Sequence, residues 1–485
     1  MRTSADYLKK LQSMKLNCYM WGKKIETPVD DPQIRANFNA LAITYDAAHD
    51  PKLKKLMTTK SHITGNTINH YTALYRGPKD MIKRIEINRI LCHMAGNCVA
   101  RCVGIDGLHS IGIMSYETDK TFGTNYYQRY LDYFKYFQDN DLSSAGAVMD
   151  VKGDRALRPH QQVDSDLYLR VVEKKKNGVI VRGAKAHTSH TVVCDEIIVL
   201  PSRGLTEKDK DYAIAFAIPT DTKGITYVNV ANVPGRKSKF THPVSSKFGF
   251  SDSLTIFDDV FIPNERIFMC GEWQFAGRLG ALFGHFHRLS HCGCIPARAD
   301  ILTGAASMIA KYNGIADKPH VRSKLVDLIT SPEIVYSCGL VSALKAKKTP
   351  SGIYMPNATY CNIGKFHESQ NIARDIAIVA DLSGGLLFTM PSDEDYALPK
   401  IGDSIKKYLK GAVNVPVEDR IRMFRLIDDI TSFMRPLAEV VGAGSPEAQR
   451  MGVLGDYDLE SKEEIAKHLA GIKSKFVPVK PAVKY

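Results

Sequence analysis

The sequence predicts an α+β fold in which a strand-rich region separates two helical regions. Apolar residues at helical spacing run through residues 1–145 and return in long stretches over residues 276–485. Between them, residues 146–275 hold short alternating runs separated by turn residues, which is typical of strands. We therefore expect an N-terminal helical domain, a middle β domain and a C-terminal helical domain with these bounds.

In the N-terminal region, the helical pattern is clearest over residues 82–103, IKRIEINRILCHMAGNCVARCV. Its apolar residues recur every three to four positions, so the pattern predicts one helix. That helix would carry Cys98 and Cys102 about one turn apart and present both thiols on a single face.

Four short alternating runs predict the main strands of the middle region. The pair Asn177-Gly178 stands between the first two runs and predicts a tight hairpin there. The runs are DLYLRVVE at 166–173, VIVRG at 179–183, DEIIVLP at 195–201 and DSLTIFDDVFIP at 252–263.

Long helical patterns fill the C-terminal region. They are clearest at residues 323–329, 366–382 and 419–441. The chain closes on a basic tail, Lys473–Tyr485, which contains two prolines and is expected to be extended. A tail across a neighbouring subunit and a loose end both agree with this composition.

Four residues with soft ligand atoms occur in two pairs, Cys98-x3-Cys102 and His287-x6-Cys294. On a helix, His287 and Cys294 would lie about two turns apart on one face. Three thiolates and an imidazole suit zinc or an iron–sulfur cluster better than magnesium or calcium, and the spacing does not choose between them. Buried structural cysteine is the alternative reading. Pro296 should kink the second helix, because it removes a backbone donor and clashes with the preceding turn.

Composition and charge narrow the class of protein. With 44% hydrophobic and 24% charged residues, the 485-residue chain can bury a large core. Ten cysteines, and no apolar stretch in the first 16 residues, predict a protein of the reducing cytoplasm. We expect no membrane span, since no run of about 18 apolar residues occurs. The +13 charge is spread along the chain and favours anionic ligands, while no motif supports nucleic-acid or Rossmann-type NAD binding.

Six segments carry a resemblance that runs nearly the whole length of the chain. They lie at residues 17–26, 56–106, 153–187, 257–272, 442–450 and 456–472, and include LCHMAGNCVARCVGID, GDRALRPHQQVD and GAGSPEAQR. In these segments the chain resembles the 4-hydroxybutyryl-CoA dehydratase branch of the 4-hydroxyphenylacetate 3-hydroxylase flavoprotein family.

The resemblance implies an acyl-CoA dehydrogenase-like fold with a β-barrel-like middle domain and a C-terminal helical bundle. It also implies bound FAD and one 4Fe-4S cluster. In the dehydratases three Cys and one His hold the cluster, and the matching positions are Cys98, Cys102, His287 and Cys294. Members are homotetramers, which implies about 216 kDa from four chains of 53.9 kDa.

The implied activity is dehydration of a 4-hydroxyacyl-CoA, of the 4-hydroxybutyryl-CoA to crotonyl-CoA type. The resemblance leaves open whether the chain also has vinylacetyl-CoA delta-isomerase activity. The C3 hydrogen is not acidic and the C4 hydroxyl is a poor leaving group. The implied route is therefore radical: a base removes the C2 proton, an electron moves to the flavin so that the C3 proton becomes acidic, and the hydroxyl leaves as the electron returns. Cluster iron would act as a Lewis acid on the hydroxyl. The resemblance therefore implies that His287 is both a cluster ligand and the candidate base. The alternative is that His287 is an ordinary histidine of the core.

Some positions depart from the dehydratase pattern. His291 stands where the dehydratases have a Tyr, so an imidazole with a reference pKa of about 6.5 replaces a phenol of about 10. It follows His287 by one helical turn and would face the same pocket. Asp252 stands near an active-site Glu of the dehydratases. Glu447 in GAGSPEAQR is the candidate second carboxylate, and an exposed glutamate of a first helical turn is the alternative.

Candidate flavin contacts are His187, Thr188 and Ser189, in a stretch that lies near the isoalloxazine in the family. The sequence here departs from the family motif His-Gln-Thr-Gly. The alternative to a flavin contact is that these residues are simply the polar end of a strand. The catalytic candidates are therefore His287, His291, Glu447 and Asp252.

Two other functions remain open. A flavin-dependent aromatic hydroxylase of the wider family would leave the four metal-ligand candidates without a purpose. A diverged, cluster-containing relative with another acyl-CoA substrate is supported mainly by His291.

Overall fold

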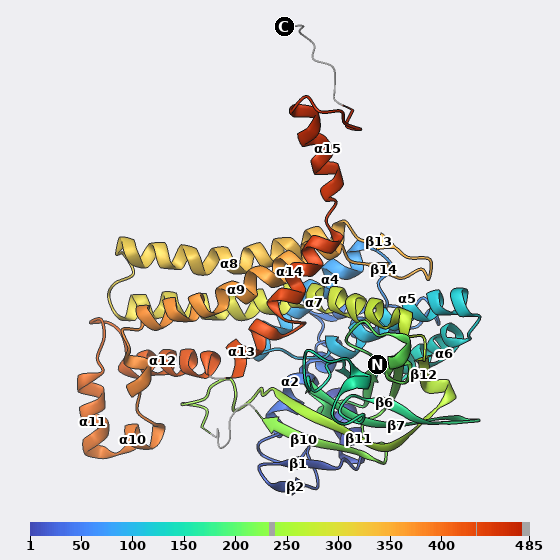
Figure 1. Cartoon of the computed structure of the whole chain (residues 1–485). Helices are drawn as coiled ribbons and strands as arrows, with labels where there is room; N and C mark the ends of the chain where they lie inside the picture. Colours follow the sequence, from blue (N-terminus) through green and yellow to red (C-terminus); the bar gives the residue numbers. More distant parts are fainter. Residues whose placement is uncertain (232–237, 433, 478–485) are drawn as a thin grey trace.

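The computed structural model places three long helices beside a layer of strands (Figure 1). It describes residues 1–231, 238–432 and 434–477. The long helices, which pack on one another, are α7 (Trp273–Tyr312), α8 (Pro319–Leu344) and α9 (Ala358–Leu382). The mixture of helices and sheets confirms the predicted α+β class.

The N-terminal region is rich in helix, but Cys98 does not lie on one. Helix α4 ends at Ala95, because Gly96 adopts the left-handed conformation (φ 61°) that caps a helix C-terminus. Cys98 lies in the loop that follows, and Cys102 is the first residue of α5. The prediction of one helix over this stretch is therefore wrong, because apolar periodicity continues on both sides of the capping glycine. The helices are α1 (Ser4–Gln12), α2 (Arg35–Asp46), α3 (Lys54–Met57), α4 (Pro78–Ala95), α5 (Cys102–Phe122) and α6 (Tyr126–Asp139).

Two sheets form the strand layer, with orders β2-β1-β10-β11-β7-β6 and β12-β9-β8-β5. Strand β1 comes from the predicted N-terminal helical domain and pairs in parallel with β10, so the larger sheet crosses the predicted boundary. The domain bounds and the barrel-like shape stay predictions. The strands are β1 (Cys18–Met20), β2 (Lys23–Ile25), β5 (Ser144–Ala147), β6 (Arg170–Lys175), β7 (Gly178–Ser189), β8 (Glu196–Val199), β9 (Ile214–Pro219), β10 (Ile225–Ala231), β11 (Ser251–Pro263) and β12 (Ile267–Cys270), and small two-stranded pairs are β3 (Thr58–Lys60) with β4 (Thr67–Asn69) and β13 (Lys347–Lys348) with β14 (Tyr354–Met355).

A long ladder joins β7 to β11 and contains the predicted flavin stretch. The hairpin predicted at Asn177-Gly178 is confirmed, since β6 and β7 pair there with Lys175 opposite Gly178. Further along β7, residues 186–187 face a single residue of β11, which is a β-bulge. His187 has a φ of 54° in this bulge. A bulge of this kind redirects side chains near the end of a strand.

The C-terminal region is helical as predicted. Helix α7 continues through Pro296 to Tyr312, and the kink expected at Pro296 stays a prediction. The predicted helical stretch 419–441 is divided, since α12 ends at Thr431 and α13 begins at Met434. The remaining helices are α10 (Asp393–Ala397), α11 (Pro399–Tyr408), α12 (Val417–Thr431), α13 (Met434–Val441), α14 (Pro446–Asp456) and α15 (Leu459–Leu469).

Helix α8 is long and apolar enough, by length and composition, to cross a membrane, and 33% of its most apolar window is buried. It is one such helix in the part of the chain that the structure describes. It packs against α7 and α9, and core helices of soluble proteins share this composition. The expectation of no membrane span therefore stays a prediction.

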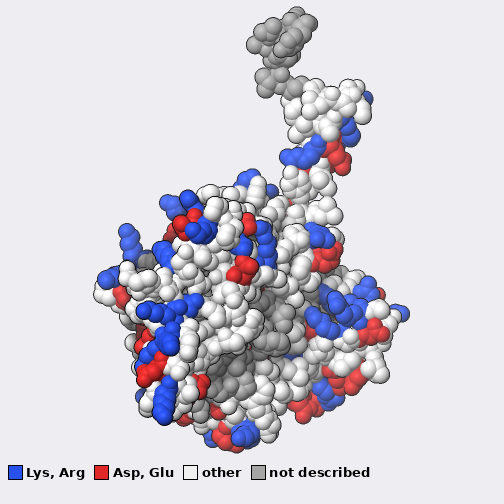
Figure 2. Space-filling model, turned by 90° about the vertical axis from the view of Figure 1, so that its left-hand side faces the viewer, with Lys and Arg blue, Asp and Glu red and all other residues white. Residues whose placement is uncertain are grey.

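Helix α15 projects from the body of the molecule (Figures 1 and 2), and no residue of this fully described helix is buried. Leu469 and Ile472 are 80% and 59% exposed. Of the basic tail, residues 473–477 are described and residues 478–485 lie outside the described part. On the face drawn in Figure 2, Lys and Arg are interspersed with Asp and Glu.

A hydrophobic core fixes α5 against α7. It includes Ile105 and Leu108 of α5 together with Phe286 and Leu289 of α7, each at most 1% exposed. Because buried side chains of this kind pack at near-crystalline density, the two helices hold a fixed relative position. The polar residues between these apolar positions are therefore brought face to face.

Candidate metal centre

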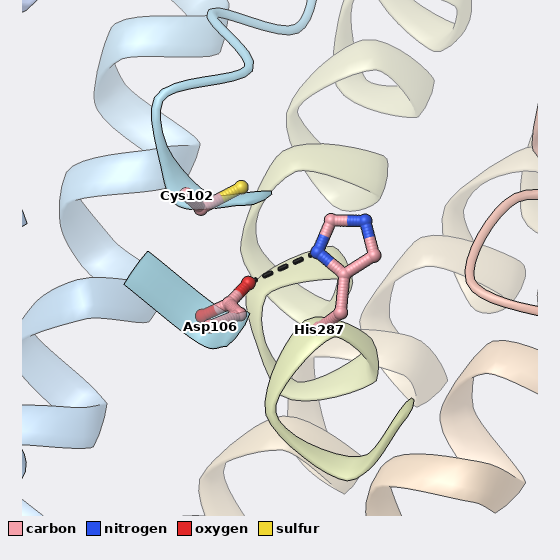
Figure 3. A group of neighbouring side chains, drawn as sticks. All are labelled: Cys102, Asp106 and His287. Carbon is pink, nitrogen blue, oxygen red and sulfur yellow. Dashed lines mark hydrogen bonds and ion pairs between the residues drawn. The ribbon is translucent and has the colours of Figure 1, made fainter. Parts of the chain in front are cut away.

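Helices α5 and α7 bring three possible ligand side chains together. The ligand atoms of Cys102, Asp106 and His287 all lie within 4.8 Å of one another (Figure 3). Cys102 and Asp106 are four residues apart on α5, so they share one face of that helix. His287 reaches the same point from α7. Residues far apart in the chain thus form one group.

Asp106 holds the imidazole of His287 in one orientation. His287 Nδ1 donates to Asp106 Oδ2 at 2.9 Å, and Ser290 Oγ donates to Asp106 Oδ1 at 3.1 Å. The Asp106 carboxylate is fully buried, and the His287 side chain is 12% exposed. Burial raises the pKa of Asp106, while the hydrogen bond and charge of His287 oppose that shift. Asp106 therefore leaves Nε2 of His287 as the free ring nitrogen.

The thiol of Cys98 lies beside those of Cys92 and Cys294. Hydrogen bonds from Cys294 and then Cys92 hold the pKa of the Cys98 thiol well below its usual value, and the charge of Arg298 adds to this effect. Cys92 is fully buried and Cys294 is 3% exposed. Cys98 is thus the thiol of this group that ionises most readily. Burial raises the pKa of the Cys102 thiol, and the charges of Asp106 and Cys98 raise it further.

All four predicted ligands therefore border one region between α4, α5 and α7. Metal-binding histidines usually donate one ring nitrogen to a carboxylate and coordinate with the other, which is the arrangement of His287. Three thiols and one imidazole are a donor set for a soft metal or an iron–sulfur cluster. The residues fit the expected 4Fe-4S cluster, and ligation by Cys98, Cys102, His287 and Cys294 stays a prediction.

His291 faces the same region, as predicted from its spacing. Its ring lies 4.7 Å from that of His287, centroid to centroid, at an interplanar angle of 72°. Its buried Nδ1 has no hydrogen-bond partner among the described residues. Burial, followed by the charges of His287 and Lys365, holds the pKa of His291 well below its usual value. The imidazole of His291 is therefore neutral at pH 7.

The strand layer approaches the Cys98 loop from the other side. Asn97 Nδ2 donates to Phe248 O at 3.3 Å, which ties this loop to the segment before β11. Asp252, on β11, accepts a hydrogen bond from Ser189 Oγ at 2.6 Å. Burial raises the pKa of Asp252, and the charge of Cys98 contributes to that rise. Asp252 therefore lies within electrostatic range of Cys98, and its catalytic role stays a prediction.

The three predicted flavin contacts have different surroundings. His187 is exposed on the β7 bulge. Thr188 is fully buried, and its hydroxyl bonds Ser253 O at 2.9 Å and Thr255 Oγ1 at 2.7 Å. Ser189 is engaged by Asp252. The hydroxyls of Thr188 and Ser189 are thus used within the sheet, and a flavin contact by any of the three stays a prediction.

Glu447 begins a helix as predicted, in the first turn of α14. Its side chain is 65% exposed and lies 3.5 Å from Arg450, one turn later. The preceding loop does reach the site, because Arg288 Nε donates to Ala443 O at 3.0 Å. In the single chain, the Glu447 carboxylate faces solvent, and its catalytic role stays a prediction.

Sequence reasoning did not identify Asp106 or Cys92. The four-residue spacing of Cys102 and Asp106 on a helix was a usable signal, because it places a carboxylate one turn from a proposed ligand. Cys92 precedes Cys98 by six residues, and only the cap at Gly96 turns the chain so that their thiols meet.

Comparison with protein families gives two matches that together cover almost the whole chain. Residues 3–269 match the family described as 4-hydroxyphenylacetate 3-hydroxylase N terminal. Residues 276–471 match 4-hydroxyphenylacetate 3-hydroxylase C terminal.

Individual relatives agree with these matches. The chain is 37% identical over 496 residues to 4-hydroxybutyryl-CoA dehydratase/vinylacetyl-CoA-Delta-isomerase of Clostridium aminobutyricum, covering 97% of this chain and 99% of the relative. A solved oxygen-tolerant archaeal 4-hydroxybutyryl-CoA dehydratase from N. maritimus has a TM-score of 0.92 at 35% identity, covering 100% and 98% of the two chains. The oxygenase component of 4-hydroxyphenylacetate 3-monooxygenase complexed with FAD has a TM-score of 0.88 at 25% identity, covering 97% and 98%.

Proposed function

The chain belongs to the 4-hydroxyphenylacetate 3-hydroxylase family, on its 4-hydroxybutyryl-CoA dehydratase branch, and we propose that it is a lyase that dehydrates a 4-hydroxyacyl-CoA. The substrate and product are of the 4-hydroxybutyryl-CoA and crotonyl-CoA type, and the enzyme also isomerises vinylacetyl-CoA. The proposal rests on the 37% identity along nearly the whole chain to a dehydratase with both activities.

The observation that carries this proposal is the buried Asp106–His287 pair beside Cys102. An aromatic hydroxylase has no need for a buried imidazole that is oriented by a carboxylate and bordered by thiols. A dehydratase that must withdraw a proton and expel a hydroxyl needs both a base and an electrophile in one place.

We assign FAD and one 4Fe-4S cluster as cofactors, with Cys98, Cys102, His287 and Cys294 as cluster ligands. When bound, the flavin supplies one-electron chemistry and the cluster supplies a Lewis acid for the C4 hydroxyl. FAD is supported by the flavin-bound structure of the related oxygenase component. The exposed bulge residue His187 offers the flavin a polar contact where β7 ends.

The chain's own residues supply the proton chemistry. Asp106 fixes the Nδ1–H tautomer of His287, so that the lone pair lies on Nε2. That lone pair would hold the cluster and, once His287 has released it, could remove the C2 proton. His291 is the candidate for the second proton, because its ring lies against that of His287 and its buried Nδ1 has no partner among the described residues. Asp252 borders the region from the strand side, where it can orient substrate.

Anaerobic purification followed by spectroscopy tests the proposal. We expect flavin bands, broad absorption at about 400 nm, about four irons per chain, and crotonyl-CoA as the product from 4-hydroxybutyryl-CoA. Flavin without iron, together with hydroxylation of a phenol, would instead establish an aromatic hydroxylase.

His291 favours a second candidate substrate, another 4-hydroxyacyl-CoA. The imidazole lies beside His287 where the dehydratases have a phenol, so the groups that face the acyl chain differ. A protein with full cofactor content that is inert toward 4-hydroxybutyryl-CoA, yet active on a related thioester, would establish this second candidate.

We propose a homotetramer of about 216 kDa, four times 53.9 kDa, in the cytoplasm. The projecting helix α15 exposes Leu459 and Leu469, and Ile472 just after it is also exposed. An apolar surface of this kind would be covered by a neighbouring subunit in the proposed assembly. All ten cysteines are described and none forms a disulfide, which agrees with a reducing compartment. Light scattering should give the tetramer mass, and a monomer mass would contradict the assembly.

A further inference from the structure

Arg84 of α4 is a fully buried, charged side chain that is not one of the candidate metal ligands. Its guanidinium lies over the ring of Tyr71 at 4.6 Å and near that of Tyr75 at 5.7 Å. Nη2 donates to the backbone oxygen of His70. Aromatic faces attract a cation, but they do not replace a carboxylate when water is excluded.

Two of the Arg84 donor nitrogens are unsatisfied. Nε and Nη1 are buried and have no hydrogen-bond partner in the described parts of the chain. An arginine keeps its charge when buried, so it cannot avoid the cost of desolvation by losing a proton. An uncompensated charge in a protein interior costs several kcal/mol, so a nearby anion is required.

A ring contact followed by a chain of hydrogen bonds connects Arg84 to the candidate metal centre. Tyr71, under the guanidinium, donates to Asn88 Oδ1 at 2.8 Å. Asn88 Nδ2 donates to Ser290 O at 3.1 Å, and the Ser290 hydroxyl donates to Asp106 at 3.1 Å. The cation therefore lies in the same rigid, buried network as the carboxylate that orients His287.

The groups of this network that can carry a negative charge belong to the candidate centre. Asp106 lies at the end of the hydrogen-bond chain, and its ligand atom lies within 4.8 Å of those of Cys102 and His287. Two other arginines near the site have partners. Arg298 pairs with Glu439 at 2.5 Å, and the guanidinium of the buried Arg288 donates to Ala443 O and to Asn362 Oδ1.

We propose that Arg84 is the counter-charge for the anionic metal group held by Cys98, Cys102, Cys294 and His287. Three thiolates around a core of charge 2+ leave one excess negative charge, and Arg84 supplies one fixed positive charge inside the same network. Net charge around a cluster sets its reduction potential, so Arg84 makes the centre easier to reduce and binds it more tightly. The inference rests on the proposed function, because it needs the cluster to be bound.

The test compares Arg84→Met with Arg266→Met in anaerobically purified, metal-loaded protein. Arg266 is a matched control, since it also lies near two tyrosine rings, at 5.0 and 5.3 Å, but has its own carboxylate, Glu196, at 2.7 Å. We expect Arg84→Met to lower the ratio of reduced to oxidised cluster at least tenfold at a fixed applied potential, a shift of about 59 mV for one electron. Arg266→Met should leave that ratio unchanged.

Two further measurements keep the inference open to refutation. Arg84→Lys, which keeps the charge, should hold the ratio within about threefold of wild type, and a tenfold loss there would overturn the proposal. The rise in melting temperature on metal loading should be smaller in Arg84→Met than in wild type. An equal or larger rise would also overturn it.

The outcome separates the two proposals. Wild-type protein that binds no iron contradicts the proposed function. If wild-type protein binds about four irons and Arg84→Met has the same ratio of reduced to oxidised cluster as wild type, only the role of Arg84 is contradicted. If Arg84→Met does not fold, the ratio measured for Arg84→Lys decides.

Discussion

The two sides of the candidate site are built differently. On the helix side, Asp106 and His287 meet across 181 positions of sequence in a buried, hydrogen-bonded pair. On the strand side, Asp252 bonds Ser189, a neighbour across one ladder of the sheet, and His187 faces solvent on a bulge. The helix side is arranged before any ligand arrives, whereas the strand side presents its polar groups near the ends of two interior strands, β7 and β11.

This difference predicts which side controls metal binding. Side chains locked by packing and by hydrogen bonds to their neighbours hold a metal at fixed geometry. Residues whose hydroxyls are already used within a sheet contribute to substrate or flavin orientation instead. Mutations on the helix side should therefore remove metal and activity together, and mutations on the strand side should lower turnover alone.

The largest effect should come from the thiols. Cys98→Ala, Cys102→Ala and Cys294→Ala should each lose most iron and essentially all activity, because a cluster short of a thiolate is rarely stable. Iron analysis and a turnover assay measure this. Cys194→Ala is the control, since Cys194 is also fully buried but lies outside the site, and it should keep its iron. A site variant with full iron content would exclude that residue as a ligand.

The next largest effect concerns His291. His291→Phe fills similar space without a proton-bearing group and should lower the rate by about 10²-fold or more, the usual scale for losing a general acid or base. His291→Tyr, which restores the phenol of the dehydratases, should preserve or raise activity toward 4-hydroxybutyryl-CoA. If Phe has no effect, His291 only packs against His287.

A smaller effect is expected from the carboxylate behind His287. Asp106→Asn should reduce metal affinity about 10- to 100-fold, because it weakens the hydrogen bond that orients the imidazole. The matched control is Asp209→Asn, which removes a buried carboxylate that bonds His160 Nδ1 at 2.6 Å elsewhere in the fold. Metal titration of both variants measures the difference. Equal affinities would mean that Asp106 does not position a ligand.

The smallest of these effects should come from the strand side. Asp252→Asn should lower turnover by about 10-fold and leave iron content unchanged, because Asp252 is a proposed substrate-orienting residue that does not belong to the ligand group. Ser189→Ala, which removes its hydrogen-bond donor, should act in the same direction. Loss of iron from Asp252→Asn would contradict the proposal that only the helix side controls metal binding.

The sequence by itself predicted the donor atoms of the candidate site and much of the scaffold that carries them. Residue type and spacing gave the soft donor set, placed His287, His291 and Cys294 on one helix, and located the hairpin at Asn177-Gly178. These features depend on residues within a few positions of one another, so local periodicity and turn preference are sufficient to predict them.

Tertiary structure decided which side chains meet. The contact of Asp106 with His287 and the burial of Arg84 over Tyr71 arise from packing between segments that are separated in the sequence. The contact of Cys92 with Cys98 depends on the turn that Gly96 makes at the end of α4. The break after Ala95 shows the same limit on a local scale, because one glycine in a left-handed conformation overrides a continuous helical pattern. Contacts of this kind depend on which apolar faces bury one another, and spacing along the chain does not encode that choice.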